Sequence, residues 1–191
     1  MANLNKTNIN GLLLKNDFLT VSEENLLLDH IDSSPWDTSL KRRVQHYGYR
    51  YNYKSKVIDN SLFEKLPDWL ENLKKKIQKY FDLDYSFNQV IINEYEPGQG
   101  IASHIDSTAS FDDIILSVSL HSACVMEFTK DDTKVPLLLE PRSILLLLLS
   151  GESRYEWKHG IKAVKKDRGI NDEIILRQRR VSITFRKIID K

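Results

Sequence analysis

Two segments in the first half of the chain place apolar residues at helical spacing. From Pro67 to Phe81 the apolar side chains fall on one side of a helix, and the four lysines of this segment fall mostly on the other. A second, shorter helix is predicted from Ser22, an N-cap residue type followed by two glutamates, through Asp29. Because a one-sided helix must bury its apolar stripe, we expect these helices to cover one outer face of a sheet.

The period changes to that of strands at Asn88. Short apolar or alternating runs follow, each bounded by Gly, Pro, Asp or Ser: NQVIINEY, DIILSVSLH, ACVMEFT, VPLLLE, RSILLLLLS, RYEWKHG and RVSITFRKI. Such a series of short strands indicates a double-sheet roll or barrel. The unbroken leucines of residues 142–150 predict a central strand that is buried on both faces. We therefore expect one α+β domain over residues 1–191, with its strand-rich core at about residues 88–188.

Composition bounds the class of protein without naming a function. The 191 residues carry 28 Lys and Arg against 27 Asp and Glu, so the net charge of +1 neither requires nor forbids a nucleic-acid partner. The single cysteine, Cys124, excludes an internal disulfide and a multi-cysteine zinc module. No signal peptide is recognisable, and the apolar run from Ile144 to Leu149 is far below the roughly 20 residues of a membrane span. We expect a soluble intracellular protein of the cytoplasm or nucleus, with no membrane partner.

The segment EPGQGIASHID, residues 96–106, places two metal-binding side chains one residue apart after a glycine-rich turn. If residues 101–106 are extended, His104 and Asp106 project from the same face and can reach one ion. Two ligands rarely hold a catalytic metal, so a third must come from elsewhere in the chain.

The third ligand is sought among the histidines of the strand-rich part, because strands of a roll converge in space. His121 and His159 both lie at the ends of predicted strands. We favour His159, because Tyr155 and Trp157 on the same strand face would form an aromatic wall beside it. Two histidines and one carboxylate suit either a non-haem Fe(II) oxygenase or a catalytic zinc.

The segment RVSITFR near the C-terminus favours iron over zinc. Alternation puts an apolar row on one face, and it puts on the other Arg180, Ser182, Thr184 and Arg186. Arginines bind carboxylates bidentately and keep their charge when buried, so the pair suits a short dicarboxylate such as 2-oxoglutarate. A hydrolytic zinc site has no use for such a pair. We expect the nearby Arg177 and Arg179 to form a solvated basic edge.

Four ordered blocks carry a resemblance to a known family: RRVQHYGYRY, NEYEPGQGIASHID, SGESRYEWKHGI and RVSITFR. From about Arg43 to Lys187 the chain resembles the AlkB family of Fe(II)- and 2-oxoglutarate-dependent dioxygenases. The resemblance implies a double-stranded β-helix (jelly-roll) core with supporting helices on one face. It implies that Fe(II) is held by His104, Asp106 and His159. It also implies that 2-oxoglutarate is contacted by Asn93, Tyr95, Arg180 and Arg186. Ser182 and Thr184, on the same strand face as the two arginines, complete the six candidate cosubstrate contacts.

The same resemblance implies an oxidation. In the family, 2-oxoglutarate chelates the iron, O2 takes the remaining position, and oxidative decarboxylation to succinate drives hydroxylation of a substrate C–H bond. If the carbon is an N-methyl group, the product loses formaldehyde. If it is an ordinary methylene, the hydroxyl group stays.

A tyrosine-rich segment is the candidate for substrate contact. In KRRVQHYGYRYNYK, residues 41–54, tyrosines alternate with cations, as on surfaces that stack bases and contact phosphates. The resemblance implies that about residues 41–60 form a nucleotide-recognition lid, over a base extruded into the pocket. The alternative is an ordinary hairpin packed on the core. The candidate substrate contacts are Arg43, His46, Tyr47, Tyr49, Arg50, Tyr51, Tyr155 and Trp157.

Within the family, the phrases EYEPGQGI, HID and RSILLLLLSGESRYEWKHGI are similar to the branch that hydroxylates the wobble uridine of tRNA. Members that demethylate adenine or cytosine tend to carry an acidic residue where this chain has Thr108. The resemblance thus favours a modified base in tRNA or other RNA as substrate. The alternatives are a DNA or RNA alkylation-repair demethylase, a demethylase of a protein side chain, and a nucleic-acid reader without activity. The tRNA enzyme also carries RNA-recognition and methyltransferase domains, so a partner protein with either role is a further expectation.

Overall fold

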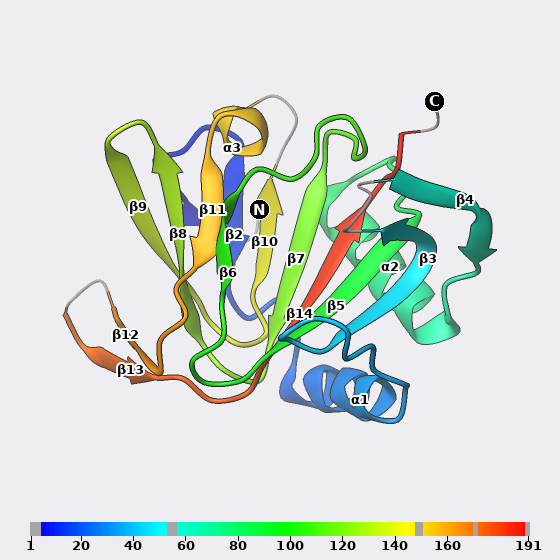
Figure 1. The fold of residues 1–191 in the computed structure, drawn as a ribbon, viewed down its shortest axis with the longest axis horizontal. Helices are drawn as coiled ribbons and strands as arrows, with labels where there is room; N and C mark the ends of the chain where they lie inside the picture. Colours follow the sequence, from blue (N-terminus) through cyan, green and yellow to red (C-terminus); the bar gives the residue numbers. More distant parts are fainter. Residues whose placement is uncertain (1–4, 53–56, 148–150, 170–171, 190–191) are drawn as a thin grey trace.

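The computed structural model describes residues 5–52, 57–147, 151–169 and 172–189 of the chain. Within these residues two antiparallel sheets face each other across the middle of the molecule, and helices cover the outer side of the larger sheet (Figure 1). This is the predicted double-stranded β-helix with its supporting helices on one face. The predicted fold class is confirmed.

The larger sheet has eight strands among the described residues. Their order is β1 (Asn5–Lys6), β2 (Leu12–Lys15), β10 (Ile144–Leu147), β7 (Ile115–Leu120), β14 (Arg180–Arg186), β5 (Gln89–Tyr95), β3 (Val44–Asn52) and β4 (Val57–Glu64). The C-terminal strand β14 is therefore central, with β7 on one side and β5 on the other.

The smaller sheet has four strands in the described part of the chain, in the order β6 (Ile101–His104), β11 (Lys158–Ile161), β8 (Cys124–Lys130) and β9 (Thr133–Leu139). A separate hairpin is formed by β12 (Lys166–Arg168) and β13 (Ile174–Leu176). The helices are α1 (Val21–Asp32), α2 (Asp68–Phe81) and α3 (Glu152–Tyr155). Neither α1, α2 nor α3 is long and apolar enough to cross a membrane, and no other described residues form a helix that could.

The two long helices begin at identifiable caps. Thr20, not Ser22, is the N-cap of α1: its hydroxyl accepts from the backbone N–H of Glu23, whose carboxylate accepts from the backbone N–H of Thr20. This reciprocal pair satisfies two N–H groups that the helix leaves without partners, so α1 starts at Val21. It also continues to Asp32, three residues beyond the predicted end. The prediction for α2 was accurate, with Pro67 at its N-cap.

The apolar row of β14 packs against the helices. Val181, Ile183 and Phe185 are fully buried in one cluster with residues of α1 and α2, including Ile31 and Ile77. Fully burying side chains of this size contributes about 1.5–3 kcal/mol each. The opposite face of β14, which carries the two arginines, is therefore fixed toward the space between the sheets.

The leucine-rich strand β10 is buried on both faces where the structure describes it. Ile144 belongs to the helix-side cluster, and Leu145 belongs to the cluster between the sheets, together with Phe128. Residues 148–150 of the predicted strand lie outside the described residues. The expectation of a central strand is confirmed, since β10 lies between β2 and β7.

The predicted strand RYEWKHG is only partly a strand. Residues Glu152–Tyr155 form the short helix α3, and the strand β11 begins at Lys158. The alternation of Tyr155, Trp157 and His159 matches a strand period but ignores the guanidinium of Arg154, which is buried and bonded to backbone carbonyls. Those bonds hold the segment in a helical turn. The predicted aromatic wall on the strand face of His159 is therefore wrong.

Candidate active site

The smaller sheet brings two histidines side by side. Strands β6 and β11 pair so that His104 lies opposite His159, and the centres of the two rings are 4.6 Å apart. The sequence predicted an extended segment through Asp106. The strand β6 instead ends at His104, so Asp106 lies in the loop that follows it. Even so, one ligand atom from each of His104, Asp106 and His159 lies within 4.8 Å of the other two.

Hydrogen bonds orient this cluster for a metal ion. The Nδ1 atom of His104 is 2.8 Å from the carbonyl oxygen of Ala102. Because a carbonyl only accepts, Nδ1 carries the proton and the lone pair of Nε2 is free to bind a metal. The Nε2 atom of His159 lies 3.6 Å from Oδ2 of Asp106. Two imidazoles and one carboxylate thus converge from one side, a donor set that fits Fe(II) and leaves positions open.

The protonation of the cluster also suits a metal. Burial alone would raise the pKa of Asp106, but the nearby positive charge, above all that of Arg186, outweighs it, so this pKa lies below its usual value. Burial lowers the pKa of His159 to about 4, against the opposing effect of Asp106. At neutral pH the carboxylate is therefore charged and the imidazole of His159 is neutral, which are the forms that bind metals.

A buried arginine holds the loop that carries Asp106. Arg154 is 1% exposed, and its guanidinium donates to the carbonyl oxygens of Asp106 at 3.0 Å, Phe111 at 2.8 Å and Asp112 at 3.4 Å. The next residue, Tyr155, donates from its hydroxyl to the carboxylate of Asp113. Helix α3 is therefore tied to the whole segment from Asp106 to Asp113. The sequence analysis did not single out Arg154.

The side of β14 that faces the cluster is polar, as alternation predicted. A cavity beside the metal ligands is lined by Arg180, Ser182, Thr184 and Arg186, together with Asn93 and Tyr95 of the neighbouring strand β5. The pairing of β14 with β5 sets Ser182 opposite Asn93 and Arg180 opposite Tyr95. All six side chains predicted to contact 2-oxoglutarate are thus brought to one cavity.

The two arginines of this cavity differ in their surroundings. Arg186 donates from Nη2 to Oδ1 of Asp106 at 2.7 Å, so it lies against the candidate metal ligand. Arg180 is 3% exposed and donates from Nη2 to Ser119, while its Nε and Nη1 have no hydrogen-bond partner among the described residues. A buried guanidinium with open donors is costly unless an anion completes it. A dicarboxylate that reaches from the metal ligands to Arg180 fits this arrangement.

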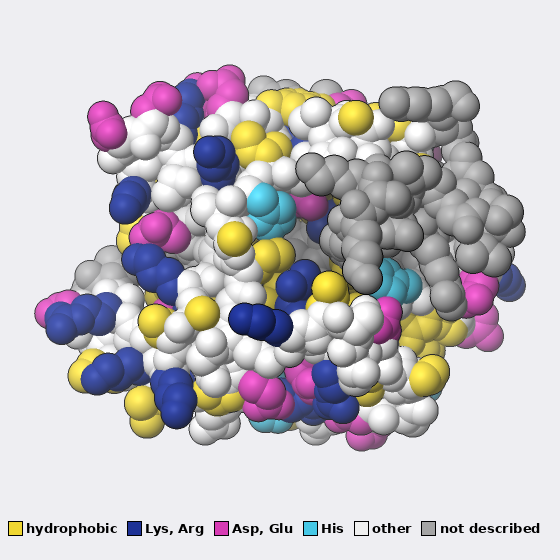
Figure 2. Space-filling view, viewed as in Figure 1, with side chains coloured by type: hydrophobic (Ala, Val, Ile, Leu, Met, Phe, Trp, Pro, Cys, Tyr) yellow, Lys and Arg dark blue, Asp and Glu magenta, His cyan; other side chains and the backbone are white. Residues whose placement is uncertain are grey.

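A second hollow opens beside the cluster. His104, Asp106 and Arg186 also line this outer groove, together with Arg42, Thr108, Phe111 and Tyr155. Figure 2 shows one face of the molecule, on which Lys and Arg side chains lie near a histidine at the middle of the view. His104 and Asp106, two of the candidate metal ligands, thus line both a polar inner cavity and an open outer groove.

Several predicted substrate residues do not lie at this groove. Trp157 is buried between the sheets and donates to Glu152. Tyr47 faces α2 and meets the ring of Trp69 edge-on. For Tyr47 the structure therefore agrees with the alternative interpretation, a segment packed on the core. Arg43 stacks on Trp36 and pairs with Glu94. Tyr47 faces the helices because it lies in β3, a regular member of the larger sheet, and alternate side chains of such a strand face opposite sides.

The remaining residues of the tyrosine-rich segment are placed as follows. His46 pairs across to Ile91, on the sheet face that also carries Thr184. The ring of Tyr49 contacts Phe63 of β4. The side chains of Arg50 and Tyr51 lie outside the described residues. Of the aromatic candidates near His159, Tyr155 does line the outer groove and is 40% exposed.

The prediction of a solvated basic edge at residues 177 and 179 is wrong. Arg177 is buried and binds both oxygens of Asp167 at 2.6 Å. Arg179 pairs with Asp32 of α1 and with Glu94 of β5. Both arginines form ion pairs that stabilise the fold. Composition alone could not distinguish such arginines from solvent-exposed ones.

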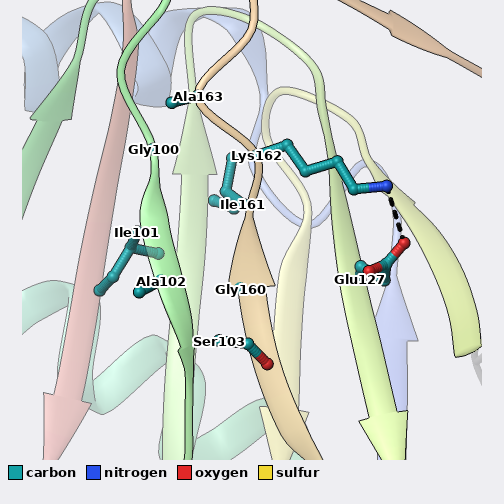
Figure 3. A pocket seen from close by; sticks show the side chains of 9 residues that line it. All are labelled: Gly100, Ile101, Ala102, Ser103, Glu127, Gly160, Ile161, Lys162 and Ala163. Atoms are coloured by element: carbon teal, nitrogen blue, oxygen red, sulfur yellow. Dashed lines mark hydrogen bonds and ion pairs between the residues drawn. The ribbon is translucent and has the colours of Figure 1, made fainter. Parts of the chain in front are cut away.

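One glycine explains the close approach of the two histidine strands. A shallow hollow on the outer side of the smaller sheet exposes the contact between Gly160 of β11 and Ser103 of β6 (Figure 3). A Cβ atom on Gly160 would lie 2.9 Å from the Cα atom of Ser103. The pairing of β6 with β11 is irregular at this point, between His159 and Ile161. Gly160 therefore lets β6 lie against β11, with His104 opposite His159.

The fold and the site together define a class of protein. A double-stranded β-helix that carries two histidines and an aspartate, beside a cavity with two buried arginines, is the architecture of a non-haem Fe(II) oxygenase that uses a 2-oxo acid. A sequence model of the 2OG-Fe(II) oxygenase superfamily matches residues 11–186, and the chain belongs to this superfamily. The cofactors of the class are Fe(II), 2-oxoglutarate and O2, and the donor set of this site fits the iron.

Known relatives place the chain with the AlkB homologues. It is 38% identical to the "Alkylated DNA repair protein ALKBH8 homolog" of Arabidopsis thaliana, over 95% of this chain and 59% of that one. It is 39% identical to the "tRNA (carboxymethyluridine(34)-5-O)-methyltransferase alkbh8" of Xenopus tropicalis, over 93% of this chain and 32% of that one. The chain thus spans less than two thirds of the length of both relatives. The solved structure of OsALKBH1 has the same fold, with a TM-score of 0.67 and 16% identity, and covers 97% of this chain and 100% of that one.

Proposed function

We propose that this domain is a dioxygenase that uses Fe(II) and 2-oxoglutarate to hydroxylate or demethylate a modified base of RNA, with tRNA as its substrate. The observation that carries the proposal is that His104 and Asp106 line both the inner cavity with the arginines and the outer groove, with His159 beside them in the inner cavity. A cosubstrate in the inner cavity and a large substrate in the outer groove can then both reach the same metal.

The three ligand side chains are proposed to hold Fe(II). When bound, the iron together with 2-oxoglutarate and O2 supplies the oxidation of a substrate C–H bond, with succinate and CO2 as the coproducts. The neutral His159 and the charged Asp106 hold the ion without prior loss of a proton at neutral pH. Arg154 keeps the backbone of Asp106 in place during this binding.

The polar face of β14 is proposed to bind 2-oxoglutarate. The open donors of Arg180 can form paired hydrogen bonds with a carboxylate, and Arg186 supplies positive charge beside the metal ligands. Asn93 and Tyr95, with Ser182 and Thr184, supply further polar groups along the cavity. Binding there leaves the outer groove open to the substrate.

The proposed choice of RNA rests on the relatives and on the groove. The frog relative is named for a modified uridine of tRNA, and the match covers 93% of this chain. The outer groove offers the exposed ring of Tyr155, on which a base can stack. A base lifted out of its stack can then reach the metal.

The test is turnover by the purified protein. Incubation with Fe(II), 2-oxoglutarate and tRNA should release succinate, and mass spectrometry of the nucleosides should show a gain of one oxygen or the loss of a methyl group with formaldehyde. The Asp106→Ala variant is the matched control, and it should abolish both signals. If the wild-type protein oxidises neither RNA nor DNA while a methylated peptide yields formaldehyde, the substrate is a protein side chain and the proposal is wrong.

We also propose that a separate RNA-binding or methyltransferase unit acts with this domain. The match covers about a third of the frog relative, so the rest of that protein has no counterpart in these 191 residues. Co-purification of the tagged domain from its native cells, with and without ribonuclease, tests this. A protein that stays bound after ribonuclease treatment supports a direct partner, and its absence would contradict one.

A further inference from the structure

Arg42 is a guanidinium at the mouth of the outer groove. It precedes the strand β3, and its Nε donates to Oδ1 of Asn93 at 2.9 Å. Its guanidinium carbon also lies 5.9 Å from the centre of the Tyr95 ring. These contacts fix one end of the guanidinium against β5, while the side chain lines the groove together with His104 and Tyr155. Arg42 is thus a positioned charge at the substrate side of the metal ligands.

Among the described residues that line the groove, no carboxylate is free to pair with a positively charged base. The cations among them are Arg42 and Arg186, and the carboxylate is that of Asp106. That carboxylate is a candidate metal ligand and already accepts from Arg186. Thr108 and Tyr155, which also line the groove, are neutral. Among the described residues that line the groove, the net charge is therefore positive.

This charge discriminates between modified bases. Methylation of a ring nitrogen, as in 1-methyladenine, gives a base with a positive charge, and this charge would be brought near Arg42 with no partner to compensate it. A uracil ring with a neutral or acidic substituent on carbon meets no such repulsion, and a carboxylate on it would be attracted. Repulsion of the wrong partner is a common source of specificity.

We propose that Arg42 is a specificity-determining residue, which makes the groove accept bases with neutral or acidic substituents and reject positively charged methylated bases. The inference rests on the proposed function, because it concerns a base in the outer groove. Its reciprocal prediction is that a negative charge at position 42 reverses the preference.

Equilibrium binding tests this without turnover. Anticodon stem-loops are prepared with 5-carboxymethyluridine, with its methyl ester or with 1-methyladenosine at the same position. Their affinities are measured by fluorescence anisotropy with Mn(II) and 2-oxoglutarate in the absence of O2. The quantity compared is the ratio of two affinities within one variant, so any effect of the Arg42 contact with Asn93 on the cosubstrate cancels. The variants are Arg42→Gln and Arg42→Glu.

The matched control is Lys41→Glu, an exposed neighbour that undergoes the same change of charge but does not line the groove. In the wild type the carboxymethyluridine RNA should bind more tightly than the methyladenosine RNA. The ratio should fall on the order of tenfold in Arg42→Gln and further in Arg42→Glu, because a charge acts strongly only at short range. Lys41→Glu should leave the ratio within about twofold.

Three results would overturn the inference in distinguishable ways. Equal weakening of all three RNAs in Arg42→Gln would show that Arg42 contacts a phosphate and does not select the base. A wild-type preference for the methyladenosine RNA would reverse the assigned specificity while leaving the proposed RNA substrate intact. If the wild type binds none of the RNAs, the proposed function itself is wrong and the inference is wrong with it.

Discussion

The guanidinium of Arg154 donates a hydrogen bond of 3.0 Å to the backbone carbonyl oxygen of Asp106. This bond joins a short helix that precedes one histidine strand to the loop that follows the other. The ligands His104 and His159 are paired by the strands themselves, but Asp106 lies beyond the end of β6. Its position relative to the histidines therefore depends on contacts such as this one. Arg154 is a positioning residue for the metal cluster.

Replacement of Arg154 by Met should weaken metal binding by about 10–100-fold, the usual effect of losing a partner that orients a ligand. The metal affinity of Arg154→Lys should fall between those of Arg154→Met and the wild type, because a lysine keeps the charge but cannot span three carbonyl oxygens. Titration with Co(II) under anaerobic conditions measures the affinity, and the visible spectrum reports the ligand geometry.

Arg177→Met is the control for Arg154, because it also removes a buried arginine and leaves Asp167 without its main partner. It should lower the melting temperature and leave the Co(II) affinity of the folded protein unchanged. Equal loss of metal affinity in Arg154→Met and Arg177→Met would show that both act through general stability, and Arg154 would have no particular role at Asp106.

Gly160→Ala should separate the two histidine strands. The added methyl group would lie 2.9 Å from backbone atoms of Ser103, so β6 must move away from β11 and His104 from His159. We expect a Co(II) affinity lower by on the order of tenfold, with a fold that is otherwise kept. Metal titration and circular dichroism measure the two effects.

Gly98→Ala is the matched control for this change. Gly98 has a positive φ of 93°, so alanine is strained there, but its Cβ would meet nothing closer than 3.9 Å. It should cost roughly 1 kcal/mol of stability and leave metal affinity as it was. If Gly160→Ala binds Co(II) as tightly as the wild type, the strand contact does not set the distance between the histidines.

Glu94 should make the stability of the fold sensitive to acid. Burial alone would raise its pKa, but Arg43 and Arg179 outweigh this, so the folded-state pKa lies below the usual value. The unfolded chain then binds a proton more readily than the folded one. The contribution of Glu94 to the stability of the fold is complete above the pKa of Glu94 in the unfolded chain. It is lost as the pH falls through the pKa of Glu94 in the folded protein.

The measurement is urea unfolding from neutral pH down to the acid range, for the wild type and Glu94→Gln. We expect Glu94→Gln to be less stable at pH 7 by about 1–3 kcal/mol, since it loses charged hydrogen bonds, and the two curves to converge as the pH falls. The control is Glu127→Gln, which removes an ion pair with the exposed Lys162 and should matter little at any pH. Curves that stay parallel would contradict the role given to Glu94.

The periodicity of the sequence correctly predicted the elements that pack with one face against the core. The alternation of β14 and the helical stripe of α2 gave the correct faces, because both elements are buried against one large core. The same reasoning failed for RYEWKHG, where Arg154 fits the alternation but its side chain binds carbonyl oxygens of a distant loop, and Glu152–Tyr155 form a helical turn. Pairwise tertiary contacts of this kind leave no mark on the period of a sequence.

The candidate site shows the same division. His104 and Asp106 were predicted from a short motif and the four residues of β14 from a strand face, whereas Asn93, Tyr95 and the full ligand set with His159 came from the resemblance to the AlkB family. On the substrate side the sequence favoured Arg43, but the structure places Arg42 at the groove and Arg43 on Trp36. The side chains of these neighbouring arginines point in different directions, and the bend in the backbone before β3 sets those directions. Composition cannot decide between them.

Arg180→Met should impair the binding of 2-oxoglutarate selectively. The open donors of Arg180 are the charged groups best placed for the carboxylate remote from the metal, and loss of a charged hydrogen bond costs about 1.5–3 kcal/mol, or roughly 10–100-fold in affinity. Calorimetry with Mn(II) in place of iron measures the dissociation constant for 2-oxoglutarate. Arg179→Met removes the next arginine along the chain, which pairs with Asp32 and Glu94 away from the cavity, and it should lower stability without changing this constant. Unchanged 2-oxoglutarate affinity in Arg180→Met, with metal still bound, would show that the cosubstrate lies elsewhere in the molecule.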